Sequence, residues 1–281
     1  METVMFTNSI KTFILIFGLV ALFGIIGNAL GGPRGMAIGL GIAAAMSLYS
    51  YWFSDKMVIR AYHGQEVTPN SNSKLYWIVS KLANRAGLPM PKVYIIPENQ
   101  PNAFATGRDP EHAAVACTQG LLELMDEDEL SGVLGHELGH VQHHDILIST
   151  IAATFAGAIS NMVNISGRQN QRGRGNVLLI ILAPVAAMIM QMAISRKREF
   201  MADEAGAEFS GNPLYLRNAL QKLETYSKQI PLQNKSHPST AHMFIVNPFA
   251  GIKSLFSTHP ATEERISRLE EMARNKGLNS W

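Results

Sequence analysis

Four long runs without any charged side chain constrain the fold of this chain more than any other feature. Asp, Glu, Lys, Arg and His are all absent from residues 12–33, 35–54, 146–167 and 175–195. Each run has roughly the 20 residues that a helix needs to cross the hydrocarbon core of a bilayer. The mean hydropathy of the whole chain is only +0.05, so the residues between these runs have the composition of a water-soluble domain. We therefore predict four membrane segments joined to a folded domain.

The first two runs predict a pair of transmembrane helices. A second apolar run follows the first at once, which favours a membrane anchor over a cleaved signal peptide. The second run ends with Tyr49, Tyr51 and Trp52, residue types that gather at the interface between lipid and water.

The third and fourth runs are weaker candidates. Asn161 and Asn164 interrupt the third run, and Pro184 and Gln191 interrupt the fourth. The two runs form either a complete transmembrane hairpin or a hairpin that packs partly on protein, where its polar groups are satisfied internally. Their length favours full spanning.

The distribution of basic residues predicts the orientation. An even number of crossings leaves the N-terminus, residues 55–145 and residues 196–281 on one side of the membrane. Basic residues flank the apolar runs on that side: Lys11, Lys56, Arg60, Arg196, Lys197 and Arg198. This pattern predicts a multi-pass protein of the cell (inner) membrane with its folded part in the cytoplasm. Arg168, Arg172 and Arg174, between the third and fourth runs, oppose it.

Composition adds two limits. Cys117 is the single cysteine of the chain, which excludes an intrachain disulfide framework and fits a reducing compartment. The formal net charge of +2 gives no argument for a nucleic-acid partner.

The five residues from His136 to His140 read His-Glu-Leu-Gly-His and predict a metal site. Residues four apart lie on one face of a helix, so both imidazoles can bind one ion. Glu137 can then act as a base toward a zinc-bound water. Asp126 and Glu129 are spaced as a capping box at the start of this helix. The alternative is a chance match, which arises on the order of once in a hundred chains of this composition.

The third ligand is predicted to come from a second pair at the same spacing, Glu199 and Asp203. Glu199 could complete a shell of two histidines and one carboxylate. Asp203 could accept a hydrogen bond from the far ring nitrogen of a ligand histidine. The alternative is an ordinary charged helix surface, with weak pairs to neighbouring arginines.

The metal motifs and the apolar runs meet at one place. No Pro or Gly separates Val141 from Ile146, so we expect the metal-binding helix to continue into the third run. The fourth run leads directly to Glu199. The helical rise over these short connections is roughly 6 to 9 Å, which would place both ligand sets just above the membrane surface.

The remaining residues predict a small mixed domain. Apolar residues recur at helical spacing in residues 73–86, from Glu199 to about residue 226, and in residues 262–276. Strands are expected at 92–96, 102–106 and 112–116. A strand at the open edge of such a sheet could bind an extended peptide, or the sheet could be purely structural. His259 could donate to a developing oxyanion, or it could cap and pack the last helix.

Together these motifs resemble the HtpX family of membrane zinc metalloproteases, related to the type I CAAX prenyl proteases. The matching residues are Pro101 to Ala105, His136 to His140, Ser195 to Asp203, and Ser257 to Pro260 followed by Arg265 and Ile266. The resemblance implies a mainly α membrane protein with an α+β zincin-like catalytic domain. It divides the chain into a transmembrane helix pair (1–54), a first catalytic part with the His-Glu-Leu-Gly-His helix (55–145), a second membrane hairpin (146–195) and a second catalytic part with the third ligand (196–281).

The resemblance also implies a function. One Zn²⁺ per chain would be bound by His136, His140 and Glu199, with Glu137 as general base and acid. The segment Asn102, Ala103, Phe104 and Ala105 looks like the substrate-binding strand, while Asp203 and His259 would support the ligands and the transition state.

The activity that the resemblance implies is hydrolysis of misfolded or damaged membrane proteins at the cytoplasmic face. Its partners would be unfolded or membrane polypeptides, the lipid bilayer and unidentified quality-control proteins. Three alternatives compete: a prenyl-protein protease, an intramembrane metalloprotease, and a membrane scaffold with a structural metal.

Overall fold

A computed structural model places residues 2–71, 73–151, 196–229 and 261–278. The elements in chain order are α1 (Glu2–Ala61), β1 (Gln65–Val67), η1 (Pro69–Ser71), α2 (Lys74–Ala86), β2 (Lys92–Ile96), β3 (Ala103–Gly107), η2 (Pro110–His112), β4 (Ala113–Thr118), α3 (Gln119–Leu124), α4 (Glu127–Gln142), α7 (Arg196–Ser210), α8 (Pro213–Gln229) and α9 (Thr262–Asn275). Among the described residues the fold is thus mostly helical with a small sheet, in agreement with the predicted class.

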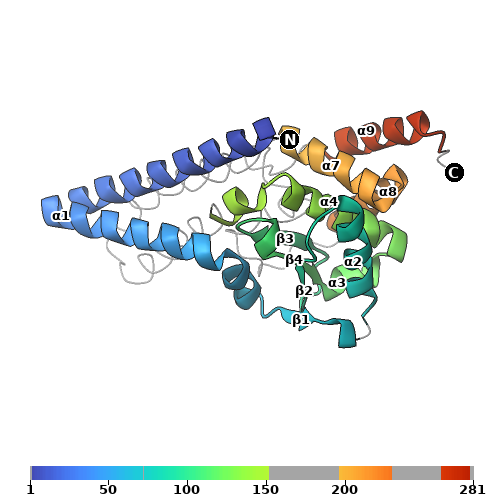
Figure 1. Cartoon of the computed structure of the whole chain (residues 1–281), viewed down its shortest axis with the longest axis horizontal. Helices are drawn as coiled ribbons and strands as arrows, with labels where there is room; N and C mark the ends of the chain where they lie inside the picture. Colours follow the sequence, from blue (N-terminus) through green and yellow to red (C-terminus); the bar gives the residue numbers. More distant parts are fainter. Residues whose placement is uncertain (1, 72, 152–195, 230–260, 279–281) are drawn as a thin grey trace.

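α1 is a helical hairpin, not a straight rod. Its helical dihedral angles are interrupted at Gly31 and Gly32, and Gly32 has a φ of 60°, which favours glycine. Pro33 follows, where a helix can restart but not continue. Figure 1 shows the two arms meeting at a tip that points away from the sheet and diverging toward the rest of the molecule.

Glycines let the two arms touch through their backbones. A Cβ atom at Gly27 would lie 2.2 Å from the carbonyl oxygen of Gly35, and one at Gly39 would lie 2.3 Å from the carbonyl oxygen of Phe23. Close backbone contact through small residues is a common way for helices to pack within membranes.

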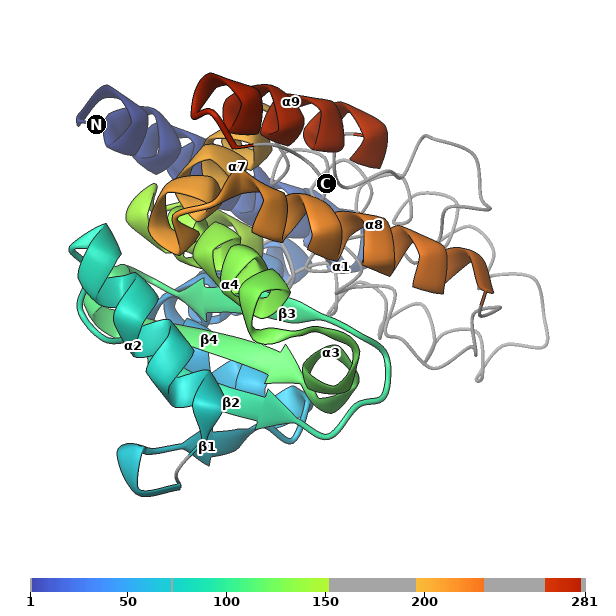
Figure 2. The same cartoon turned by 90° about the vertical axis from the view of Figure 1, so that its right-hand side faces the viewer.

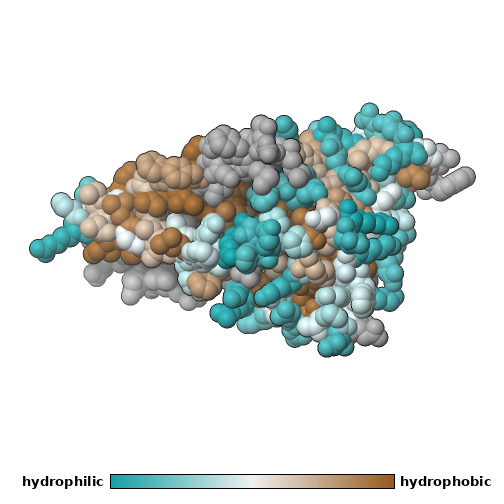
Figure 3. Space-filling model, viewed as in Figure 1, coloured by the Kyte–Doolittle hydropathy of each residue, from teal (hydrophilic) through white to brown (hydrophobic). Residues whose placement is uncertain are grey.

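One arm has the length and composition of a membrane span. Residues Gly31–Phe53 form a candidate membrane span of 23 residues with a mean hydropathy of 1.4, while the other arm holds a shorter apolar helix, Ile16–Ala29. Large apolar side chains are exposed on both arms, and Figure 3 shows them as a brown band over the hairpin. Of the four predicted segments, 35–54 therefore falls in a helix long enough to cross a bilayer. The third and fourth lie outside the described residues, except for 146–151.

A four-stranded sheet forms one layer of the domain beside the hairpin. The strand order is β1-β2-β4-β3, with β2 and β4 parallel and the outer strands antiparallel to their neighbours. The three predicted strands are confirmed, with bounds that differ by at most two residues. β3 lies at an edge of the described sheet, as a peptide-binding strand would require.

Helices cover both faces of the sheet (Figure 2). On one face Ala103, Ala105 and Val115 join the main core with α2 and α4. On the other face Phe104 packs with Val58 of the last turns of α1. α7 and α8 pack on α4, so α4 lies at the centre of the domain and most of its residues are buried.

The start of α4 and its close packing on α7 follow from local sequence. The predicted capping box is present: the amide of Glu129 donates to Asp126 Oδ1 at 2.9 Å, and the amide of Asp126 donates to Glu129 Oε2 at 3.0 Å. A Cβ atom at Gly139 would lie 3.0 Å from Cα of Ala202 and 2.9 Å from Cβ of Ala205. The absence of a side chain at Gly139 therefore allows α7 to approach the metal-binding helix closely.

The end of α4 differs from the prediction. The helix stops at Gln142 instead of continuing to Ile146. The amide of Asp145 donates to the carbonyl of His140 at 2.9 Å, and the amide of His144 donates to that of Val141 at 3.1 Å. These two bonds form a Schellman motif. His144 takes the left-handed residue of that motif, with a φ of 56°. Glycine usually occupies this position, so the histidine there leaves the end of the helix without its common sequence marker.

Candidate metal centre

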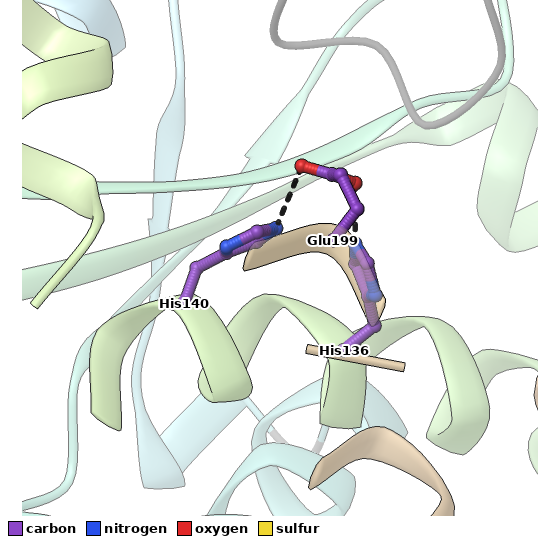
Figure 4. Close-up of side chains that lie close together, drawn as sticks. All are labelled: His136, His140 and Glu199. Atoms are coloured by element: carbon purple, nitrogen blue, oxygen red, sulfur yellow. Dashed lines mark ion pairs between the residues drawn. The ribbon is translucent and has the colours of Figure 1, made fainter. Parts of the chain in front are cut away.

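Two histidines of α4 and one glutamate of α7 face a common point (Figure 4). Nε2 of His136 lies 3.7 Å from Oε2 of Glu199, and Nε2 of His140 lies 3.6 Å from Oε1 of the same residue. The three ligand atoms all lie within 4.8 Å of one another. The structure thus brings the three predicted ligands together, because their helices pack at Gly139.

The ring of His136 is fixed from the side opposite to Glu199. Its Nδ1 lies 2.9 Å from Oδ1 of Asp203. Arg265 of α9 binds both oxygens of Asp203, with Nε donating to Oδ2 at 2.9 Å and Nη2 donating to Oδ1 at 2.6 Å. All three side chains are buried. Since the carboxylate accepts the proton on Nδ1, the lone pair of Nε2 is left for a metal.

His140 has a second carboxylate and a second arginine behind it. Its Nδ1 lies 3.4 Å from Oδ2 of Asp145. Arg198 donates from Nη1 to Oδ1 of Asp145 at 3.5 Å. Asp145 and Arg198 are both buried.

Glu137 points from α4 toward the edge strand. The backbone amide of Ala105 donates to Oε2 of Glu137 at 3.0 Å. Burial raises the pKa of the Glu137 carboxyl, because the charged form loses hydration, while the adjacent His136 and His140 act in the opposite direction. A carboxylate whose pKa is raised toward neutrality is a better proton acceptor and donor at neutral pH.

The carboxylates around the ligand histidines favour a positive charge at the centre of the cluster, as the pKa of His140 shows. Burial alone would lower the pKa of His140, but Glu199, Asp145 and Glu137 together raise it to about 9. Burial would raise the pKa of Asp203, yet Arg265 and the hydrogen bond from His136 hold it well below its usual range. Asp203 therefore stays ionised beside the imidazole that it orients.

The donor set fits zinc. Zinc binds nitrogen and oxygen ligands tetrahedrally at about 2.0–2.2 Å, which separates neighbouring ligand atoms by about 3.3–3.6 Å. The nitrogen–oxygen separations of 3.6 and 3.7 Å are close to that range. Three protein ligands leave one coordination position for substrate or water, as in catalytic zinc sites.

The predicted substrate strand lies next to this site. The amide of Thr118 on β4 donates to the carbonyl of Asn102 at 2.9 Å. Because alternate residues bond to the neighbouring strand in an antiparallel pair, Ala103 and Ala105 direct their backbone groups away from β4. The bond from Ala105 to Glu137 agrees with this direction.

Two other predictions have different outcomes. His259 lies outside the described residues, so its role stays a prediction. Arg198, predicted to be a flanking charge at the membrane, is buried and bonds to Asp145 instead.

Sequence reasoning assigned no role to Arg265 or Asp145. Arg265, Leu269 and Ala273 are the buried residues of α9, at helical spacing. An arginine within an otherwise apolar stripe was therefore the available signal for Arg265. Asp145 had no such signal, since its position depends on the Schellman motif.

Comparison with known proteins identifies the family. Residues 69–273 match the model of Peptidase family M48. These residues make up more than half of the chain. The chain belongs to peptidase family M48. The match begins at η1 and ends in α9, so it includes strands β2, β3 and β4 and every described residue of the metal cluster.

Individual relatives agree with this assignment at the level of sequence, and a solved structure agrees with the fold. A protein named Protease HtpX homolog from Burkholderia mallei (strain SAVP1) is 54% identical over 278 residues, which cover 95% of this chain and 98% of the relative. The protein of the same name from Burkholderia thailandensis gives the same values. The crystal structure of S. mikatae Ste24p covers 96% of this chain and 67% of that chain, with a TM-score of 0.53 and 19% identity. At that identity the likeness to Ste24p supports the fold alone.

This M48 chain is a metallopeptidase of the HtpX type, and the resemblance drawn from the sequence is confirmed. Family membership implies polypeptide substrates and a metal, typically zinc. Among the described residues, His136, His140 and Glu199 form the group that could hold the metal.

Proposed function

We propose that this M48 peptidase is a membrane-anchored zinc endopeptidase that hydrolyses misfolded or damaged membrane proteins at the cytoplasmic face. His136, His140 and Glu199 bind the metal, and Glu137 is the general base and acid. The observation that carries this proposal is the position of Glu137, which is buried beside the ligand cluster and hydrogen-bonded to the edge strand.

A bound zinc ion would supply Lewis acidity that polarises a carbonyl and lowers the pKa of water. Glu137 would accept a proton from the attacking water and later deliver it to the leaving amine. The amide of Ala105 holds Oε2 of Glu137, which limits rotation of the carboxylate. Asp203 keeps His136 in the tautomer that offers Nε2 to the metal.

The edge strand gives this site a means of holding a polypeptide. A substrate that adds to β3 by main-chain hydrogen bonds would pair with the outward backbone groups of Ala103 and with the carbonyl of Ala105, while the Ala105 amide stays bonded to Glu137. Because such bonds involve the backbone of both chains, they bind many sequences, which suits an enzyme that removes unfolded proteins.

The hairpin supports a location at the membrane. Its exposed apolar side chains need a nonpolar environment, and exposed Tyr49, Tyr51 and Trp52 end the candidate span. Lys56 and Arg60 follow on the exposed surface, which favours the cytoplasmic side for the catalytic domain. A site held at this surface would meet segments that have left the bilayer.

The alternatives are less well supported. An intramembrane protease would carry its histidine motif in an apolar span, whereas α4 packs between the sheet and the α7–α8 pair and has an acidic N-cap and first turn, Asp126 to Glu129. A structural metal site usually has four protein ligands. Three ligands with a buried glutamate beside them favour catalysis.

Glu137→Gln tests the proposal directly, because the amide keeps the shape of the side chain but cannot accept the proton. The full chain would be purified in detergent and supplied with an unfolded membrane protein, with zinc per chain measured in parallel. We expect the variant to bind one zinc per chain and to lose at least about 1,000-fold in cleavage rate, near the contribution of general base catalysis. Cleavage at the wild-type rate would refute the role of Glu137.

A further inference from the structure

We propose that Asp145 and Arg198 form a positioning pair that holds the His140 ring in the orientation needed to bind zinc. This inference rests on the proposed function of His140 as a metal ligand. It assigns a role to two buried charged residues that take no part in the proton transfers described above.

The contacts form a continuous chain from α7 to the ligand. Arg198 Nη1 donates to Asp145 Oδ1 at 3.5 Å, and the other oxygen of Asp145 lies 3.4 Å from Nδ1 of His140. Asp145 and Arg198 are 3% and 5% exposed, respectively. Charged groups so deeply buried are retained only with partners, since an isolated buried charge is strongly unfavourable.

The backbone places Asp145 in this position. The Schellman motif at the end of α4 turns the chain back, and the Asp145 amide bonds to the carbonyl of His140 itself. One residue therefore contacts His140 through both its backbone and its side chain. Arg198 in turn precedes the predicted ligand Glu199, so a single turn of α7 provides a ligand and the support for another ligand.

The two ligand histidines have parallel arrangements. His136 is backed by Asp203 and Arg265, and His140 is backed by Asp145 and Arg198. A carboxylate behind a ligand histidine fixes its tautomer and ring orientation, and its loss commonly weakens metal binding by about 10- to 100-fold. The arginine holds the carboxylate in place, so its effect reaches the metal only through Asp145.

The positioning role of Arg198 and its positive charge predict opposite effects on zinc affinity when the residue is replaced. Removing a cation near the site should strengthen binding of a divalent ion if only electrostatics mattered. If Arg198 acts by positioning Asp145, its removal should weaken binding. Arg198→Met keeps most of the aliphatic volume, and Arg196→Met removes the same charge from an exposed position of the same helix.

The experiment measures zinc affinity of the full chain in detergent by competition with a chromophoric chelator. We expect Asp145→Ala to bind zinc about 10- to 100-fold more weakly than the wild type. Arg198→Met should bind more weakly, by up to about tenfold, and Arg196→Met should not weaken binding. Glu129→Gln, at the opposite end of α4, controls for general loss of stability.

Two further readouts keep the test decisive. Circular dichroism of the metal-free variants establishes that they are folded, and Asp145→Asn replaces Asp145→Ala if the latter is not. The visible absorption bands of the Co²⁺-loaded protein should shift in the Asp145 and Arg198 variants and not in Glu129→Gln. Zinc binding by Arg198→Met as tight as the wild type or tighter would overturn the inference. Failure of the wild type itself to bind zinc would instead overturn the proposed function.

Discussion

Replacement of Arg265 by alanine should release α9 from the metal centre. Arg265 is 1% exposed and makes two hydrogen bonds to Asp203, at 2.9 and 2.6 Å. Hydrogen bonds that involve charged groups contribute about 1.5–3 kcal/mol each, and removal of one partner of a buried ion pair costs about 3–5 kcal/mol. The two hydrogen bonds together give about 3–6 kcal/mol, and the ion-pair estimate of about 3–5 kcal/mol falls within that range, so we use the narrower one. We expect most of it to appear in the docking of α9, because Arg265 and Leu269 are its most deeply buried contacts.

Hydrogen exchange of the α9 amides, measured on the metal-free protein in detergent, reports this local opening. A loss of 3–5 kcal/mol should accelerate exchange by roughly 100- to 5,000-fold, since 1.4 kcal/mol corresponds to a factor of about ten. Arg265→Lys should recover only part of the protection, because an ammonium group cannot reproduce the bidentate contact.

Leu269→Ala is the matched control on the same helix. It removes a fully buried apolar side chain and should cost about 2–5 kcal/mol, so α9 exchange should accelerate to a similar degree. It leaves Asp203 and its contact with His136 unchanged, so zinc affinity should fall in Arg265→Ala and not in Leu269→Ala. Acceleration of less than about tenfold in Arg265→Ala would refute the reasoning from the buried ion pair.

Three other changes test separate parts of the fold. His144→Gly should stabilise the protein by about 0.5–1 kcal/mol, because glycine adopts the left-handed φ of 56° without strain; an unchanged or lower melting temperature would contradict this account of the end of α4. Gly139→Ala should destabilise the protein by about 1–3 kcal/mol and weaken zinc binding, since the new Cβ would lie 2.9 Å from Cβ of Ala205. A melting temperature and zinc affinity equal to those of the wild type would contradict this, because they would show that α7 tolerates the methyl group. Zinc at a free concentration 100 times its Kd should raise the free energy of unfolding by about 2.7 kcal/mol, and a chelator should abolish this gain. His136→Ala should show neither effect. An equal gain in that variant would mean that the zinc binds elsewhere.

Local patterns in the sequence predicted most of the elements. The strands at 92–96, 102–106 and 112–116 were placed to within two residues, because alternation and turn residues act over short distances. The capping box of Asp126 and Glu129 was also predicted in full. The end of α4 was not, since His144 occupies a position where glycine is the usual signal.

The sequence by itself determined which residues can bind a metal, because the spacing of His136 and His140 places both on one helical face wherever that helix lies. Only the tertiary structure decided what surrounds them. Asp203 and Arg265 are 62 residues apart in the chain, and Asp145 and Arg198 are 53 apart. Such contacts depend on how α4, α7 and α9 pack. Local periodicity sets which face of each helix is buried, but packing in three dimensions determines which buried charges meet.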